Sequence, residues 1–347
     1  MNRTYDSGHE TVALNERNNT LEVIDQTLLP YEFRMEELDD IEDIWEAIYL
    51  LKVRGAPAIG VAAAIGMYVT ALKVKAADRR DFDRQFKNNM EYLNSARPTA
   101  VNLSWALERM ESVLLKEPEL PVAEALKRLK SEALKIKEED TDTCLKIGEN
   151  ALTLLKEGSR LLTHCNAGQL ATTRYGTATA AMYLGQERGY GFRIYCDETR
   201  PLLQGARLTA YELMAAGMDV TLVCDNMVAS LMRQGMIDAV LVGCDRVAAN
   251  GDVANKIGTS VVATVAKRYK VPFYVCGPTS TIDPRTKTGN DIVIEQRPAE
   301  EVTEMWYEKR MAPEGVRVFN PAFDITDNEL ITAIITERGI CRAPYNF

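Results

Sequence analysis

The chain has 347 residues, more than one hydrophobic core usually supports, so we expect two domains. Hydrophobic residues make up 46% and charged residues 26%, which is typical of a folded globular protein, and no apolar run approaches the roughly 20 residues that cross a bilayer. The net charge of −9 argues against a nucleic-acid-binding surface, although a few basic residues could still hold a small anion.

The cysteines and histidines indicate a compartment and limit metal binding. None of the seven cysteines forms a CxxC pair, and the N-terminal segment has no hydrophobic signal-peptide core. We therefore predict a reducing, cytoplasmic environment without a disulfide framework. Only two histidines, His9 and His164, are present, which leaves few ligands for a transition metal, and we predict no metal site.

The first half of the chain predicts a small domain of strands and helices. After a polar tail of about fifteen residues, two short strands at 21–29 and 31–37 form a hairpin around Pro30. Helical patterns follow at residues 41–51, 53–75, 78–93 and 105–157, the last broken by Pro118 and Pro121. The pattern then changes, and we place the domain boundary between residues 145 and 146.

Two arginines in this half lie near helix starts. Gly55 and Ala56 open the helix after Arg54, with a proline in its first turn, where the missing N–H costs nothing. The free N–H groups and the helix dipole would bind an anion, and Arg54 would add a fork of donors. The alternative is a packing helix capped by a solvated arginine. Arg97 precedes Pro98 and is therefore expected in a turn, where arginine is usually solvated.

Apolar runs alternate with helical segments in the second half, which predicts a mostly parallel sheet covered on both faces. The predicted strands are 161–165, 192–196, 220–224, 239–244 and 271–276, with short strands at 292–295 and 316–320 and a closing helix at 328–338. Polar residues follow the strands, and ligands bind outside the carboxyl ends of strands in such sheets. The chemistry is therefore expected at this edge.

Cys165 lies in the stretch around which the chain is organised, residues 160–181. It ends a short apolar strand, and after a turn a small-residue segment at 172–181 has the spacing of a buried helix. A thiol at the end of a strand occupies the usual ligand-binding position of a parallel sheet. The alternative is a cysteine that only packs as a small buried hydrophobe.

Three further polar groups could serve a phosphorylated ligand. Asp245 follows a strand, and near an anion it could keep a proton and act as a general acid, or it could be an ionised turn residue. Lys256, after Asn255, precedes a helix and could hold a phosphate together with the N–H groups of that helix. Gln204 could hydrogen-bond a sugar hydroxyl or merely cap a helix.

Several common chemistries lack their motifs. The sequence has no GxGxxG after a strand, no GxxxxGK[ST] and no GxSxG, which weighs against nicotinamide, nucleotide-triphosphate and serine–histidine chemistry. The remaining inventory is a thiol, an acid, an amide and two or three cationic residues without a cofactor motif. It suits proton transfer on a small phosphorylated sugar.

Six motifs are distinctive in combination: RGAPAIG at 54–60, SARPTAVNL at 95–103, THCNAGQLATTRYGTA at 163–178, DETRPLLQGARLTA at 197–210, GCDRVAANGDVANKIGT at 243–259 and GPTSTIDP at 277–284. From about residue 20 to the C-terminus, the chain resembles the methylthioribose-1-phosphate isomerases. The wider family includes ribose-1,5-bisphosphate isomerases and the regulatory subunits of the translation-initiation guanine-nucleotide exchange factor.

The resemblance implies conversion of 5-methylthioribose 1-phosphate to 5-methylthioribulose 1-phosphate in methionine salvage, by a homodimer without a cofactor. It implies a small N-terminal α+β domain at 1–145 and a Rossmann-like catalytic domain at 146–347. By motif, Cys165 and Asp245 are the implied catalytic pair. The implied substrate contacts are Arg54, Gly55, Ala56, Arg97, Gln204, Asn255 and Lys256.

Two rival functions stay open. One is an isomerase for ribose 1,5-bisphosphate or another aldose 1-phosphate. A second phosphate at C5 would need cationic groups around it, whereas a methylthio group would need an apolar wall. The other is a non-catalytic regulatory subunit that binds sugar phosphates or nucleotides. The pair Cys165 and Asp245 favours an enzyme, because a binding module has no need of it.

Overall fold

The computed structural model describes residues 10–98 and 101–347. The chain forms two compact units. The first runs to Leu145 and also contains Gly168–Gly176, whereas the second consists of Lys146–Ala167 and Thr177–Phe347. The chain therefore returns once to the first unit, directly after the turn that carries Cys165. Within the described ranges, no helix is long and apolar enough to cross a membrane.

The first unit combines a three-stranded antiparallel sheet with helices. Its strands, in spatial order, are β1 (Val12–Asn15), β2 (Thr20–Ile24) and β3 (Met35–Leu38). Its helices are α1 (Ile41–Tyr49), α2 (Ala56–Ala71), α3 (Arg79–Asn94), α4 (Val101–Lys116) and α5 (Val122–Leu152), which continues into the second unit. The predicted hairpin and helices are confirmed with shifted ends. The expected tail is wrong from Val12 onward, where β1 pairs with β2. Residues 1–9, and Thr99 and Ala100 of the second motif, lie outside the described residues.

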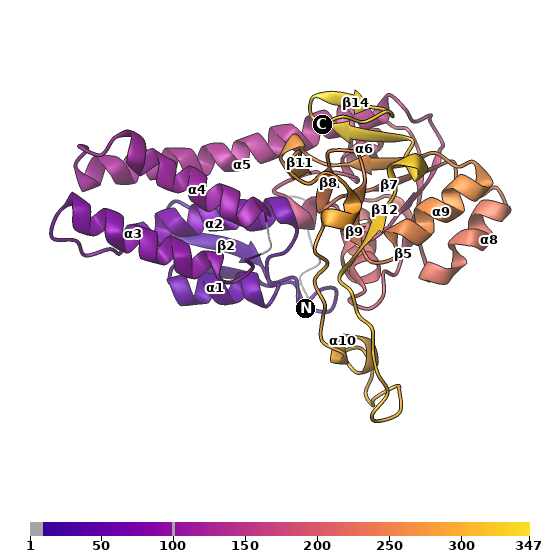
Figure 1. Cartoon of the computed structure of the whole chain (residues 1–347), viewed down its shortest axis with the longest axis horizontal. Helices are drawn as coiled ribbons and strands as arrows, with labels where there is room; N and C mark the ends of the chain where they lie inside the picture. The colour runs from indigo at the N-terminus through magenta and orange to yellow at the C-terminus, as the bar shows by residue number, and fades with distance from the viewer. Residues whose placement is uncertain (1–9, 99–100) are drawn as a thin grey trace. The chain divides into compact units, whose positions relative to one another are not determined.

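Helix α2 is the centre of this unit. Every residue from Ala58 to Ala71 is buried, because the helix is apolar on all sides. Its small residues allow close packing: a Cβ on Gly60 would lie 3.1 Å from the carbonyl oxygen of Asn102 on α4. Figure 1 shows α2 and α4 side by side. The buried helix gives its first turn, where Gly55 and Ala56 lie, a fixed position in the unit.

The second unit contains a seven-stranded sheet in the order β14-β13-β10-β7-β4-β5-β6. Its strands are β4 (Arg160–Thr163), β5 (Arg193–Asp197), β6 (Asp219–Val223), β7 (Ala239–Val242), β10 (Phe273–Cys276), β13 (Ala333–Thr336) and β14 (Gly339–Cys341). All neighbouring pairs are parallel except β13 and β14. The predicted mostly parallel sheet is confirmed.

The strand order reverses at β4. From β4 the chain adds β5 and β6 on one side, and it then returns to add β7, β10 and β13 on the other. Ligands of open α/β sheets bind at such a switch point, outside the carboxyl ends of the two strands where the order reverses. Here these strands are β4 and β7, which precede Cys165 and Asp245.

Helices cover the sheet, and a second, small sheet lies beside it. The helices are α6 (Ala180–Glu187), α7 (Ala210–Ala215), α8 (Val228–Arg233) and α9 (Thr259–Tyr269), with short 3-10 helices η1 (Gln169–Ala171), η3 (Asp225–Met227), η4 (Thr279–Thr281), η5 (Gly289–Asp291) and η6 (Asn328–Leu330) and a π-helix η2 (Gly205–Thr209). Apolar residues of α8 and α9 share one core with β7 and β10. The small sheet has the order β11-β8-β9-β12, with β8 (Arg246–Ala248), β9 (Val253–Lys256), β11 (Ile282–Asp283) and β12 (Phe323–Thr326).

Four predicted elements are wrong, two helices and two strands. Residues 172–179 form turns rather than a helix. The segment up to Gly176 belongs to the first unit, where Thr173 donates its N–H and hydroxyl to Asp140. Residues 328–338 contain η6 and β13 instead of a helix, since the buried run Ala333–Thr336 pairs with β10 and β14. The predicted strands at 292–295 and 316–320 are absent from these described segments, where Gln296 and Pro321 form one isolated bridge.

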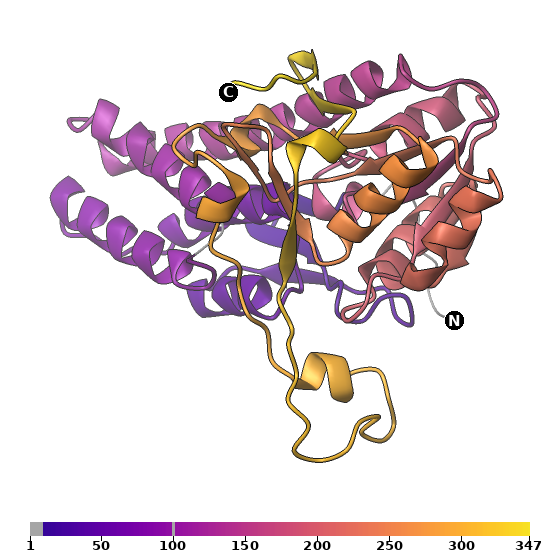
Figure 2. The same cartoon turned by 45° about the vertical axis from the view of Figure 1, so that its right-hand side comes forward.

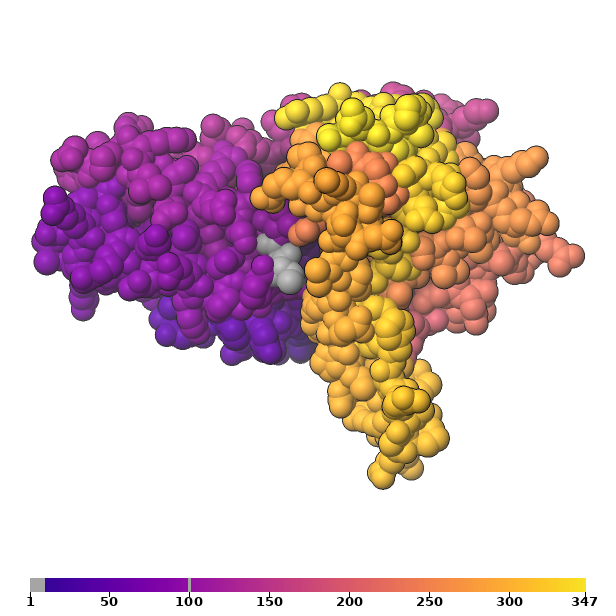
Figure 3. All heavy atoms as spheres, viewed as in Figure 1, coloured from indigo at the N-terminus to yellow at the C-terminus, as the bar shows by residue number. Residues whose placement is uncertain are grey.

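Residues 292–321 form an arm that extends away from the seven-stranded sheet, with α10 (Glu300–Thr303) near its tip (Figures 2 and 3). The arm is fastened to the loop after β5. Trp306 donates its indole N–H to the carbonyl of Pro201 at 2.7 Å, and Arg200 donates to the carbonyl of Val302 at 2.8 Å. The arm therefore supports the loop that leads to Gln204.

Candidate active site

Cys165 has a left-handed backbone, with φ of 62°, which costs a non-glycine residue about 1–2 kcal/mol. Two threonine hydroxyls hold it. The N–H of Cys165 donates to Oγ1 of Thr199 at 2.8 Å, and its carbonyl accepts from Oγ1 of Thr209 at 2.6 Å. The side chain of Asn166 donates to the same Thr209 hydroxyl at 3.0 Å. The turn after β4 is thus fixed by the loop and helix that follow β5.

Cys165 is 9% exposed and forms no disulfide, nor does any other cysteine in the described residues. A side chain that is partly accessible to solvent at the carboxyl end of a strand can contact a bound ligand. Both interpretations of this cysteine, a reacting group and part of an apolar wall, therefore agree with its position.

The ring of His164, next to Cys165, is buried between two acceptors. Its Nδ1 lies 2.8 Å from Oδ2 of Asp197, and its Nε2 lies 2.9 Å from the carbonyl oxygen of Ile257. Burial alone lowers the pKa of this imidazole, but the Asp197 carboxylate and the Ile257 carbonyl outweigh burial and raise the pKa to about 9. The surroundings of His164 therefore favour the charged form of its ring.

A second acid completes this network. Asp225 accepts hydrogen bonds from the N–H groups of Thr199 and Arg200, each at 2.7 Å, and burial raises the pKa of its carboxyl. One ligand atom from each of His164, Asp197 and Asp225 lies within 4.8 Å of the others, a spacing that could suit a metal ion. Both ring nitrogens and both carboxylates already hydrogen-bond to protein groups, however, so the set fits an ion-pair network better than an open metal site.

Asp245 leaves the end of β7, the strand beside β4, and its side chain is exposed. Its N–H donates to the carbonyl of Ala254 at 2.9 Å. Arg246, the next residue, pairs with the same Ala254 in the antiparallel strands β8 and β9. The structure therefore brings Asp245 next to Asn255 and Lys256, which end β9.

Lys256 lies at the end of a strand, not in the helix-start loop that we expected. Its ammonium nitrogen is 4.5 Å from the centre of the Phe323 ring. Asp324 accepts from the N–H groups of Gly258 and Ser260, so its carboxylate occupies the start of α9. Asp324 thus occupies two of the N–H groups near Lys256, and the binding of a phosphate beside Lys256 stays a prediction.

Gln204 is 6% exposed and precedes the π-helix η2. Among the described residues, nothing hydrogen-bonds to its buried Oε1. A buried amide oxygen without a partner costs about 1–3 kcal/mol, so this oxygen is available to a hydrogen-bond donor. Gln204 makes no side-chain cap to η2, so the capping alternative is wrong.

The other predicted contacts belong to the first unit. Gly55 has φ of 88° and precedes α2, and a Cβ on it would lie 2.5 Å from the backbone of Ala171. No described side chain caps the start of α2. Arg54 and Arg97 are both half-buried rather than freely solvated. Their roles stay predictions.

Sequence reasoning assigned no role to four residues that hold the site loops: Asp197, Thr199, Thr209 and Asp324. Asp197 and Thr199 fall within the DETRPLLQGARLTA motif. The motif therefore marked them as part of the family pattern, but residue spacing did not reveal what they contact. Reasoning from strand patterns also missed β8 and β9, although Asn250-Gly251 between them is a strong hairpin signal.

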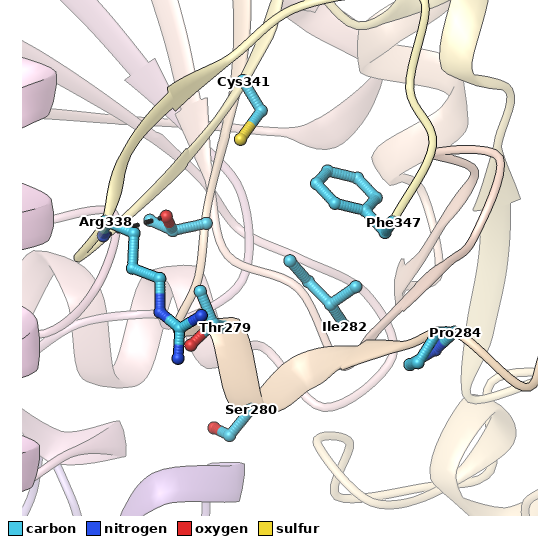
Figure 4. Close-up of a pocket in the computed structure, with 8 residues that line it drawn as sticks. Thr279, Ser280, Ile282, Pro284, Arg338, Cys341 and Phe347 are labelled. Atoms are coloured by element: carbon cyan, nitrogen blue, oxygen red, sulfur yellow. Dashed lines mark hydrogen bonds between the residues drawn. The ribbon is translucent and has the colours of Figure 1, made fainter.

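A separate hollow of about 540 Å³ lies elsewhere in the second unit, between η4, β14 and the last residue. Figure 4 shows Ile282, Cys341 and Phe347 around it. It contains none of the predicted site residues, so we assign no part of the reaction to it. Its lining residues are Thr279, Ser280, Ile282, Pro284, Thr336, Arg338, Cys341 and Phe347.

A doubly wound sheet with a thiol and a carboxyl beyond the two strands of its switch point defines an α/β protein built to handle a small ligand. The chain belongs to the initiation factor 2 subunit family, whose model matches residues 52–343. It is 63% identical over 336 residues to a methylthioribose-1-phosphate isomerase from Symbiobacterium thermophilum, covering 97% of this chain and 94% of that one.

Two further similarities matter for function. A 5-deoxyribose 1-phosphate isomerase from Petrotoga mobilis is 57% identical over 334 residues, covering 96% of each chain. The crystal structure of 5-methylthioribose 1-phosphate isomerase from Pyrococcus horikoshii matches with a TM-score of 0.92 at 43% identity, covering 97% of this chain and 93% of that one. The resemblance and the fold class that the sequence motifs implied, a small α+β part followed by a Rossmann-like part, are thereby confirmed.

Proposed function

We propose that the chain converts 5-methylthioribose 1-phosphate to 5-methylthioribulose 1-phosphate, an aldose–ketose isomerisation in methionine salvage. High identity to named isomerases supports this. One structural observation supports it most. Cys165 and Asp245 follow the carboxyl ends of β4 and β7, two neighbouring parallel strands at the point where the strand order reverses.

The substrate sets a specific chemical problem. Its anomeric carbon carries phosphate, so the ring cannot open as that of a free sugar does. An acid has to protonate the ring oxygen, and we assign this role to Asp245. Because Asp245 is exposed, the bound sugar phosphate itself has to supply the shielding and negative charge that favour a protonated carboxyl.

The hydrogen on C2 then has to reach C1. In a proton route, protonation of the ring oxygen by Asp245 breaks its bond to C1, and the Cys165 thiolate takes the C2 proton to leave a C1=C2 enol. The thiol then returns the proton to C1, and the proton of the C2 hydroxyl passes to the Asp245 carboxylate as the C2 ketone forms. In a hydride route, the hydrogen moves with its electron pair from C2 to the C1 that ring opening has left electron-poor, the C2 hydroxyl gives its proton to the Asp245 carboxylate, and Cys165 lines a dry wall around the reacting carbons. We favour the proton route. Solvent deuterium at C1 of the product would support it, whereas full retention of a C2 label would contradict it.

Binding of the phosphate and hydroxyl groups is proposed for the remaining motif residues. Lys256 would act as a point charge, and Gln204 would satisfy its buried Oε1 with a sugar hydroxyl. The other proposed contacts are Arg54, Gly55, Ala56, Arg97 and Asn255.

The similarity to a 5-deoxyribose 1-phosphate isomerase favours a second candidate substrate, 5-deoxyribose 1-phosphate. It shares the blocked anomeric carbon and an apolar group at C5. The deciding experiment incubates the purified chain with 5-methylthioribose 1-phosphate, 5-deoxyribose 1-phosphate and ribose 1,5-bisphosphate and measures ketose formation. Ketose from none of the three would overturn the isomerase proposal and favour a regulatory subunit.

We further propose a cytoplasmic homodimer. Apolar side chains on the arm support association of two copies, since Val293 is 89% and Phe319 82% exposed. Seven cysteines without a disulfide support a reducing compartment. Sedimentation of the purified chain at the mass of one 38.7 kDa copy would contradict the dimer.

A further inference from the structure

We propose that His164 is a positioning residue of this isomerase: a buried imidazolium that joins the turn of Cys165 to the loop after Lys256. This inference rests on the proposed function and goes beyond it, because His164 itself contacts none of the reacting atoms in the proposed mechanism.

The hydrogen bonds of the ring require two N–H groups. Oδ2 of Asp197 and the carbonyl oxygen of Ile257 are both acceptors, and they lie 2.8 Å and 2.9 Å from Nδ1 and Nε2. A neutral imidazole carries one N–H and could satisfy only one of them. Leaving a buried carboxylate or carbonyl unpaired is costly, so the doubly protonated ring is favoured.

The ring also fills its space closely. A Cβ on Gly258 would lie 2.8 Å from Cε1 of His164, and Gly258 has φ of 102°, which side chains rarely adopt. Glycine is therefore required where the loop after Lys256 passes the ring. The ring thus contacts this loop through both packing and a hydrogen bond.

The same ring reaches the Cys165 turn by a second route. Oγ1 of Thr199 donates to Oδ1 of Asp197 at 2.9 Å and accepts the N–H of Cys165 at 2.8 Å. Asp197 therefore serves the ring with one carboxylate oxygen and the Cys165 turn with the other. Loss of the imidazolium would disturb both the strained backbone of Cys165 and the position of Lys256.

The charged groups around the ring come from two elements. Asp197 ends β5, and Asp225 begins η3 and is also close enough to favour the charged ring. The loop before α9 contributes the Ile257 carbonyl and the backbone of Gly258, whose N–H donates to the Asp324 carboxylate of β12 at 2.8 Å. The buried cluster of two acids and one imidazolium therefore links the loops after β4, β5 and β9, and this link requires the second proton on the His164 ring.

The first experiment needs no substrate. The chain has only two histidines, so ¹⁵N-histidine labelling gives two imidazole signals, and a His9→Gln variant identifies that of His164. We expect both ring nitrogens to be protonated at pH 7 and to titrate near pH 9. A neutral ring at pH 7 would overturn the inference, whatever the substrate of the chain proves to be.

The second experiment measures kcat and KM for wild type, His164→Gln and Asp197→Asn across pH. Because misplacement of a reacting group by about 1 Å can cost 100-fold, we expect His164→Gln to lower kcat by about 10- to 100-fold. In wild type, kcat should fall at high pH together with the ¹⁵N titration. Asp197→Asn should move the titration and this fall in kcat to lower pH by the same amount, which a merely structural role would not do.

Arg160→Gln is the matched control. Arg160 pairs with Asp238 at 2.6 Å at the opposite end of β4 and β7, so its loss removes an ion pair from the same two strands without touching the site loops. It should leave kcat and its pH profile unchanged. A kcat for His164→Gln within twofold of wild type would overturn the inference. If a variant fails to fold, disagreement between the wild-type ¹⁵N titration and the wild-type kcat profile would do the same.

Discussion

A Cβ on Gly243 would lie 2.6 Å from the Cβ of Ala167, so the residue after β7 touches the turn after β4. Cys165 and Asp245 each lie two residues from this contact, one on each strand exit. The contact packs the two strand exits closely together at one edge within the second unit. Substitutions of Cys165 and Asp245 should therefore alter chemistry without rearranging the fold.

Cys165→Ser should lower kcat by at least about 100-fold, the effect expected when an acid–base group is lost, and should leave KM nearly unchanged. Serine keeps the size and the backbone hydrogen bonds to Thr199 and Thr209. Steady-state kinetics checks the prediction, and the thermal midpoint serves as the control for folding. Turnover close to that of wild type would remove Cys165 from the reaction.

Asp245→Asn should also lower kcat by at least about 100-fold, since an amide cannot deliver the proton to the ring oxygen. The side chain is exposed, so the free energy of unfolding should stay within about 0.5 kcal/mol of wild type. Kinetics and denaturant unfolding test both parts. If the variant retains near-normal turnover, the assignment of Asp245 as the acid is wrong.

Lys256→Ala and Arg54→Ala should chiefly raise KM, because we propose that both side chains bind the phosphate. Loss of a charge-assisted hydrogen bond of about 1.5–3 kcal/mol corresponds to roughly a 10- to 150-fold weaker interaction. Inhibition by inorganic phosphate should weaken in parallel. An unchanged KM for either variant would exclude that residue from phosphate binding.

Gln204→Leu should change stability and binding in opposite directions. The substitution removes a buried oxygen that has no partner among the described residues, so the thermal midpoint should stay equal or rise. KM should nevertheless increase by about 3- to 10-fold, since a sugar hydroxyl loses one hydrogen bond. A lower thermal midpoint with unchanged KM would show that Gln204 serves the fold alone.

Stability should depend on pH through His164. Its pKa is raised from 6.5 to about 9 in the folded chain, so the imidazolium stabilises the folded state fully below about pH 6.5. This contribution, on the order of 3 kcal/mol, should shrink as pH rises and be lost above about pH 9. Urea unfolding at pH 6, 8 and 10 measures it, and His164→Gln is the reference without it. A constant difference between the two across this range would contradict the assignment.

The motifs and strand patterns determined much of this protein in advance. Short β-branched runs that end in polar residues indicate parallel strands, because a sheet buried on both faces needs continuous apolar strands and binds ligands at their carboxyl ends. Cys165 and Asp245 could be singled out in this way, and the specific motifs indicated the family. These signals are local, so the sequence carries them without any knowledge of packing.

Only the tertiary structure decided how the site loops are held. Three contacts join residues 33 to 66 positions apart: the pairing of His164 with Asp197, the bond of the Thr199 hydroxyl to the Cys165 backbone, and the bond of Asp324 to the start of α9. Distant partners also set the conformation of two further segments. Residues 172–179 form turns where Thr173 bonds to Asp140, and β13 is a strand that pairs with β10 and β14. Such choices depend on which partners folding brings together, and no local pattern encodes them.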